Sequence, residues 1–161
     1  MSISFSGSEL VNIAIGIERR GIAFYDVMAK STKNAVAGDA FRYLGDMERQ
    51  HVKIFQNMLA EADKYQPSET YPGEYAAYLE ALVSSAVFTD EMLASEMATQ
   101  SDSDIKALQL AIAAEKDSIL FYYEMRDIMS PRAQPAVNRI IAEEKLHLRQ
   151  LSETKKRLDT L

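Results

Sequence analysis

The chain repeats one helix-forming pattern, and this repeat constrains its fold more than any other feature. The segment IERRGIAFYDVM at residues 17–28 aligns with AEKDSILFYYEM at residues 114–125. MERQHVKIF at residues 47–55 likewise aligns with EEKLHLRQL at residues 143–151. Each half of the chain therefore has a helix with a glutamate, followed by a helix with a Glu-x-x-His motif. Two such halves can pack around a pseudo-twofold axis.

Apolar residues at helical spacing, with few glycines and prolines between them, predict four long helices. We expect these helices at about residues 7–31, 35–65, 104–129 and 132–159. Ser6 and Glu9 have the spacing of a capping box at the start of the first helix. Ser130 and Pro131 suit the N-cap and the first position of the last helix.

The connections between these helices predict the topology. Short linkers make an antiparallel hairpin of the first two helices and another of the last two. About forty residues separate the hairpins. We expect short helices there, near residues 74–84 and 89–99, because a structureless loop of that length is uncommon. Two hairpins joined by one long crossover have ferritin-like connectivity. We therefore predict an all-α, ferritin-like four-helix bundle, as a single domain over residues 1–161.

Charge and cysteine content exclude several classes of function. The net charge is −6, which disfavours binding to nucleic acid or to an anionic membrane. The absence of cysteine excludes disulfides, thiolate catalysis, zinc fingers and cysteine-ligated iron–sulfur centres. The N-terminus lacks the features of a signal peptide, and no apolar run reaches the ~18 residues of a spanning helix. We expect a cytoplasmic protein.

Both histidines of the chain follow a glutamate by three residues, as Glu48-x-x-His51 and Glu144-x-x-His147. On a helix, positions i and i+3 share one face and lie about 4.5 Å apart along the axis. A carboxylate and an imidazole so placed can bind the same metal ion. Each pair nevertheless lies among apolar residues of its helix, which predicts that these polar side chains face the core.

Glu18 and Glu115 also lie within the apolar stripes of their helices, near the middle. Buried carboxylates without partners are costly, and several together raise one another's pKa. Two divalent cations would neutralise four carboxylates, with the imidazoles completing the coordination. This is the ligand set of dinuclear carboxylate bundles. The predicted metal ligands, with no catalytic residue beyond them, are Glu18, Glu48, His51, Glu115, Glu144 and His147.

Other interpretations of these motifs remain open. A Glu-x-x-His pair can be solvated or internally hydrogen-bonded, and a bundle can keep its fold after losing a metal site. Tyr25 and Tyr122 stand seven residues after the first glutamate of each half. They are either core aromatics or phenols that hydrogen-bond a ligating carboxylate of the opposite half. Glu143 points about 100° away from its neighbour Glu144 and is either solvated or in contact with a ligand.

The segments IERRGIAFYDVMA, DMERQHVKIF, AEKDSILFYYEM and AEEKLHLRQL resemble the ferritin-like superfamily, and most closely the rubrerythrin-like diiron proteins. The resemblance covers nearly the whole chain. It implies that the six residues bind two iron ions, and that bound Fe(II) is oxidised by peroxide or dioxygen and then re-reduced. Carboxylate-rich sites of this kind also suit manganese, and zinc would bind as well.

Two departures from the rubrerythrin pattern bear on function. Typical rubrerythrins have a rubredoxin-type four-cysteine iron site, whereas this chain has no cysteine and lacks that domain. The electron donor is then a separate protein, or the iron itself exchanges. Typical members also carry a second glutamate on the third helix, where this chain has Ser118. The remaining set resembles the symmetric one of bacterioferritins, although no fifth helix of a storage cage follows the fourth.

These observations leave three hypotheses. The leading one is a diiron oxidoreductase for peroxide or oxygen detoxification. The second is a ferroxidase that stores or delivers iron, and the third is a non-enzymatic metal-binding helical bundle. We also expect a homodimer, for which the crossover offers apolar candidates at Tyr71, Tyr75, Tyr78 and Phe88.

Overall fold

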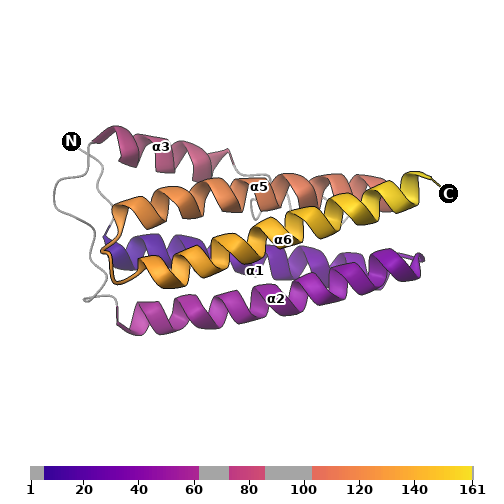
Figure 1. Ribbon diagram of the computed structural model, residues 1–161, viewed down its shortest axis with the longest axis horizontal. Coiled ribbons are helices and arrows are strands. Elements are labelled where there is room, and N and C mark those ends of the chain that lie inside the picture. Colours follow the sequence, from indigo (N-terminus) through magenta and orange to yellow (C-terminus); the bar gives the residue numbers. More distant parts are fainter. Residues whose placement is uncertain (1–5, 62–72, 86–102, 161) are drawn as a thin grey trace.

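The computed structural model describes residues 6–61, 73–85 and 103–160. Over these residues the chain is helical and contains no strand, which confirms the predicted all-α bundle. The helices are α1 (Gly7–Ser31), α2 (Ala35–Ala60), α3 (Gly73–Ser84), α5 (Asp104–Ile128) and α6 (Gln134–Asp159). Figure 1 shows α1, α2, α5 and α6 side by side, with α3 lying along one end of α5.

The helices pair as the linkers predict. α1 packs mainly on α2, and α5 packs mainly on α6, each pair forming an antiparallel hairpin. The two hairpins then meet through contacts of α1 with α5 and of α2 with α6. This arrangement places the two repeated halves of the sequence against each other. No described helix combines the length and the apolar character that a bilayer-spanning segment requires.

Side-chain caps explain where three of the helices begin. Ser6 and Glu9 form the predicted capping box, in which the Ser6 hydroxyl accepts from the Glu9 amide at 3.1 Å. The Asn34 side chain accepts from the Ala37 amide at 3.0 Å and starts α2. Ser103 does the same for α5. Each cap supplies an acceptor for an amide that has no partner within the helix.

The start of α6 was predicted wrongly. The structure begins this helix at Gln134, whereas Ser130 and Pro131 were expected to begin it. Residues 131–133 form a turn instead, held by hydrogen bonds such as that from the Ala133 amide to the Ser130 carbonyl. The reason is Pro135, which has no amide hydrogen to donate to a preceding turn. It therefore fits only where that donor is not needed, in the first turn of the helix.

Two other boundaries differ from the sequence prediction or lie beyond the described residues. α2 ends at Ala60 rather than near residue 65, because Glu61 leaves the helical conformation with a φ of −113° and a ψ of 23°. α3 agrees with the helix predicted at 74–84. The helix predicted at 89–99 lies outside the described residues. So do Tyr71, Phe88 and the side chain of Tyr75, whereas Tyr78 is 41% exposed.

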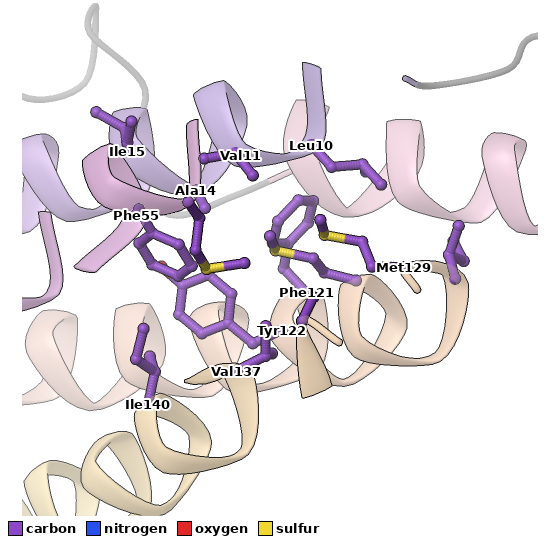
Figure 2. Packing of buried hydrophobic residues seen from close by; sticks show 14 of the residues in the cluster. Leu10, Val11, Ala14, Ile15, Phe55, Phe121, Tyr122, Met129, Val137 and Ile140 are labelled. Atoms are coloured by element: carbon purple, nitrogen blue, oxygen red, sulfur yellow. The ribbon is translucent and has the colours of Figure 1, made fainter. Parts of the chain in front are cut away.

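The apolar core is divided into two clusters along the bundle axis. One contains Leu10 and Val11 of α1, with Phe55 packed on Tyr122 at a ring-centroid separation of 5.4 Å (Figure 2). The other contains Phe24 of α1, with neighbours from the start of α2 and of α5. Along α1 the buried residue that separates the two clusters is Glu18. A polar layer therefore lies between two apolar ends of the bundle.

Candidate metal centre

Six polar side chains form the layer between the two apolar clusters. They come from all four long helices, and none is more than 4% exposed. They are Glu18, Glu48, His51, Glu115, Glu144 and His147. These are the six residues that the repeat singled out, and the structure brings all of them together. Burial of so many ionisable groups requires strong mutual compensation, because each is costly to remove from water alone.

The layer consists of two overlapping groups of four ligand-type residues. In each group, one candidate ligand atom from every residue lies within 4.8 Å of all the others. The first group pairs Glu18 with His51, and the second pairs Glu115 with His147. Glu48 and Glu144 belong to both groups. The two carboxylates that the groups share thus lie at the centre of the layer.

The histidines turn the same ring nitrogen toward this centre. Nδ1 of His51 lies 3.1 Å from a carboxylate oxygen of Glu48 and 3.1 Å from one of Glu144. Nδ1 of His147 lies 2.9 Å from the other oxygen of Glu144 and 3.6 Å from Glu48. The two imidazole rings stack with centroids 5.6 Å apart. Both rings therefore place Nδ1 among carboxylate oxygens, where it would bind a metal ion after losing its proton.

Among themselves, the six side chains reach neutrality by sharing protons. Burial raises the pKa of Glu18, and the neighbouring Glu48 and Glu144 charges raise it further. Burial followed by the same two charges also raises the pKa of Glu115. Although burial opposes protonation of His147, the hydrogen bonds that it donates to the surrounding carboxylates raise its pKa to about 12. At His51 burial also lowers the pKa, but hydrogen bonds to Glu144, Glu18 and Glu48 raise it overall. Without cations, two imidazolium ions therefore face two carboxylates and two carboxylic acids.

The shared carboxylates are the ones that stay ionised. Burial and its neighbour Glu144 act to raise the pKa of Glu48, but hydrogen bonds from Glu18 and from both imidazoles lower it overall. The pKa of Glu144 is likewise lowered, because hydrogen bonds from His147 and His51 outweigh burial. The four protons on the imidazolium ions and the carboxylic acids carry the same total charge as two divalent cations. The residues therefore fit a dinuclear site, since carboxylate oxygens and neutral imidazole nitrogens are ligands for iron, manganese and zinc.

Two tyrosines connect the hairpins at this layer. The Tyr25 hydroxyl of α1 donates to Glu115 of α5, and the Tyr122 hydroxyl of α5 donates to Glu18 of α1. Burial, and then the charge that Glu115 or Glu18 carries when it is ionised, raises the pKa of both phenols. Each phenol is therefore a neutral donor that fixes a carboxylate of the opposite half. Gly45 of α2 lies beside Tyr25, where an added Cβ would be in van der Waals contact with the Tyr25 Cβ at 3.4 Å.

Removal of either phenol hydroxyl is expected to weaken metal binding. The variants Tyr25→Phe and Tyr122→Phe each leave a buried carboxylate without its donor, and we expect a loss of about 10–100-fold in affinity for Zn²⁺. Tyr123→Phe is the matched control, because it removes a phenol hydroxyl that contacts Lys145 at the surface of the same region. Titration against a chelating dye measures the affinities. Equal affinities in all three variants would contradict a role for the buried phenols.

Glu143 contacts the layer in a way that the sequence did not reveal. Its Oε2 lies 2.8 Å from Nε2 of His51, across the interface between α6 and α2. Its other oxygen accepts a hydrogen bond from Nε of Arg139 at 3.1 Å. Sequence analysis left Glu143 either solvated or in contact with a ligand, because helical periodicity gives its direction on α6 but not its partner on another helix. The structure shows the contact.

A small pocket adjoins the carboxylates between α1 and α5. Its cavity volume is about 40 Å³, and its walls include Glu18, Glu48 and Glu115. Leu82 and Val83 of α3 also line it. On this scale a single water needs roughly 10–15 Å³, so the pocket accommodates only a few atoms. The sequence did not predict it, because it depends on where α3 lies against the bundle.

Two small residues keep this pocket open. Gly21 lines it, and a Cβ at that position would lie 3.6 Å from Cγ of Glu48. Ser118 lines it from α5, and its hydroxyl donates to the Ala114 carbonyl at 3.1 Å. Larger side chains at either position would reduce the space beside the carboxylates. The space beside the candidate ligands therefore depends in part on residue size on α1 and α5.

Comparison with known proteins agrees with this architecture. The family model described as Rubrerythrin matches residues 9–155, a range that includes all six candidate ligands. Among solved structures, the crystal structure of a DUF305 fragment from Deinococcus radiodurans is similar, with a TM-score of 0.64 at 14% identity. The match covers 94% of this chain and 95% of that one, and at this identity it supports the fold alone. Among curated proteins, none matches the chain significantly.

Proposed function

The chain belongs to the rubrerythrin family, and from this premise we propose that it is a diiron-carboxylate oxidoreductase that oxidises bound Fe(II) with peroxide or dioxygen. The observation that carries the proposal is the pair of overlapping four-residue groups, buried and sharing Glu48 and Glu144. Two bound Fe(II) ions would supply the two electrons, and solvent the two protons, that reduce peroxide to two water molecules, leaving two Fe(III) ions. The proposed ligands are the six residues of the layer, within a single domain.

The chain's own residues would perform three tasks in this reaction. Glu48 and Glu144 belong to both groups and would hold the two ions close together. The phenols of Tyr25 and Tyr122 would fix the two outer carboxylates by hydrogen bonding. The pocket would admit the oxidant, and its volume of about 40 Å³ favours a molecule of two to four atoms over an organic substrate. Water would otherwise be excluded by the apolar clusters on either side.

Ser118 favours a second candidate function, ferroxidation coupled to iron delivery or storage. Typical rubrerythrins are expected to have a glutamate at this position, whereas the Ser118 hydroxyl donates to the Ala114 carbonyl in the pocket wall. The candidate ligands are then the six residues of the layer, without a seventh carboxylate. Since the chain has no cysteine, re-reduction would need a separate electron-donor protein or the exchange of iron itself. We further propose a homodimer.

The proposal is tested with protein purified without chelators. We expect elemental analysis to find about two metal ions per chain, in accordance with the two groups. The Fe(II)-loaded protein is then mixed anaerobically with peroxide, or separately with dioxygen, and the near-ultraviolet absorption of ferric iron is followed. Faster oxidation by peroxide supports the peroxidase, whereas faster oxidation by dioxygen with many irons per large assembly supports the ferroxidase. Absence of bound metal and of oxidation would contradict both.

A further inference from the structure

We propose that Glu143 is a positioning residue that makes the two halves of the metal centre unequal, with tighter binding in the half that contains His51. This inference rests on the proposed metal centre. Its first observation is the contact at His51, where Nδ1 faces the shared carboxylates while Nε2 lies 2.8 Å from Oε2 of Glu143. Both ring nitrogens of this histidine therefore have polar neighbours.

The second observation is the contrast at His147. Its Nδ1 faces Glu144 just as Nδ1 of His51 faces Glu48. Its Nε2, however, is buried and has no hydrogen-bond partner among the described residues. A buried ring nitrogen without a partner is disfavoured, because it has lost its hydrogen bond to water. The Nδ1 atoms of the two histidines thus have equivalent surroundings, whereas the surroundings of their Nε2 atoms differ.

The sequence repeat encodes this difference. The alignment of residues 47–55 with 143–151 matches the two glutamates and the two histidines of the motifs, but it pairs Glu143 with Met47. A thioether sulfur is only a weak acceptor, whereas a carboxylate is a strong one. The symmetry of the ligands is therefore broken at the position that immediately precedes each ligand glutamate. Glu143 is itself oriented by Arg139, whose Nε lies 3.1 Å from its other oxygen.

A carboxylate that accepts from the outer nitrogen has a defined effect on a ligating histidine. It keeps the proton on Nε2, which leaves the lone pair of Nδ1 free to bind metal, and it restricts rotation of the ring. It also increases the basicity of the ligating nitrogen. Only His51 receives this assistance from a described residue. Loss of such a partner lowers metal affinity about 10–100-fold, which is the difference that we expect between the two halves.

Zn²⁺ titration measures this difference without relying on activity. In the parent protein we expect two binding steps that differ about 10–100-fold in affinity. Glu143→Met installs the residue of the aligned position, so the tighter step should weaken by that factor while the weaker step is unchanged. Glu143→Gln keeps an oxygen acceptor and should give an intermediate loss. Glu153→Met is the control, because it changes a glutamate of the same helix whose side chain is 60% exposed.

Nuclear magnetic resonance of the Zn²⁺-loaded protein assigns the effect to one histidine. The chain has only two histidines, so ¹⁵N-histidine labelling gives at most two imidazole N–H signals. We expect one signal to be protected from solvent exchange and shifted by hydrogen bonding. Glu143→Gln should move this signal, and His51→Gln should remove it. This readout uses Glu143→Gln and does not require the two affinities to be resolved. It therefore remains decisive if Glu143→Met folds poorly.

The outcomes separate this inference from the proposed function. If the parent protein binds no metal and does not oxidise Fe(II), the proposed function fails. If it binds two ions and oxidises Fe(II), yet Glu143→Met weakens both steps equally or neither step, only the inequality is overturned. A shifted imidazole signal that belongs to His147 would also overturn it.

Discussion

Glu48→Ala is expected to abolish stoichiometric binding of both metal ions and to slow Fe(II) oxidation by more than about 100-fold, the upper end of the range for residues that only support a ligand. The reason is the position of Glu48, which belongs to both four-residue groups and lies between the two imidazoles. His147 belongs to one group only. His147→Ala should therefore lose one ion first and retain partial binding at the other position.

The matched control for this pair is Asp46→Ala. Asp46 precedes Glu48 by two residues on the same helix, but its side chain is 76% exposed and forms an ion pair with the surface residue Arg49. We expect its metal content and oxidation rate to equal those of the parent. Metal content is measured by elemental analysis and oxidation by stopped-flow absorbance. Oxidation at the parent rate in both Glu48→Ala and His147→Ala would exclude the layer as the reactive centre.

The second large effect concerns stability against pH. Chelator-treated protein is expected to become less stable as the pH rises from about 6.5 to 9, by up to about 1.4 kcal/mol for each pH unit and each titrating group. The pKa of His147 is raised from 6.5 to about 12 in the folded protein. Its proton therefore stabilises the folded state fully below pH 6.5, and this contribution is lost progressively as the pH rises toward 12. The raised pKa values of Glu18 and Glu115 likewise make the folded state less stable as the pH rises.

Metal loading should reverse this trend. Metal ions compete with protons for the same ligands, so affinity for metal increases with pH. At a hundredfold excess over its dissociation constant, an ion that binds only the folded state adds about 2.7 kcal/mol of stability. For a chain of this size each kcal/mol corresponds to roughly 2–4 °C in Tm.

Thermal unfolding followed by circular dichroism at pH 6.5, 7.5 and 8.5 measures both trends. The chelator-treated protein should unfold at progressively lower temperatures, and the Zn²⁺-loaded protein at constant or higher ones. His147→Gln removes one of the titrating groups and should flatten the curve of the chelator-treated protein. A Tm of the chelator-treated parent that rises over this range would contradict the proton-sharing arrangement of the layer.

The helical bundle could be predicted from the sequence because the signals that specify its helices are local. Apolar spacing and the capping box of Ser6 and Glu9 act within one helix, and the structure confirms the four long helices that such signals predict. The errors occur where local signals compete. Ser130 and Pro131 form a good start signal, but Pro135 four residues later cannot donate a hydrogen bond back into the helix. At the end of α2, no glycine or proline marks the stop at Ala60.

Some features of the site could likewise be predicted from local sequence, whereas others depend on tertiary packing. The convergence of the six polar side chains follows from helix register and from the repeat, since each lies at the middle of its helix. Their role as metal ligands stays a prediction. Glu143 could not be assigned a partner, because its contact with His51 depends on how α6 is rotated against α2. The pocket depends on α3, whose place no periodicity of α1 or α5 specifies.

The arrangement of the helices gives the proposed ions a mechanical role. Within each hairpin the helices pack extensively, whereas contacts from one hairpin to the other are fewer. Each four-residue group nevertheless contains candidate ligands from both hairpins, with Glu18 and Glu48 on one side and Glu144 on the other in the first group. An ion bound there would cross-link the two hairpins near the middle of the bundle. Without bound metal the two hairpins would separate more readily. The chain would then be degraded faster by proteases in a metal-poor solution than in the metal-loaded state.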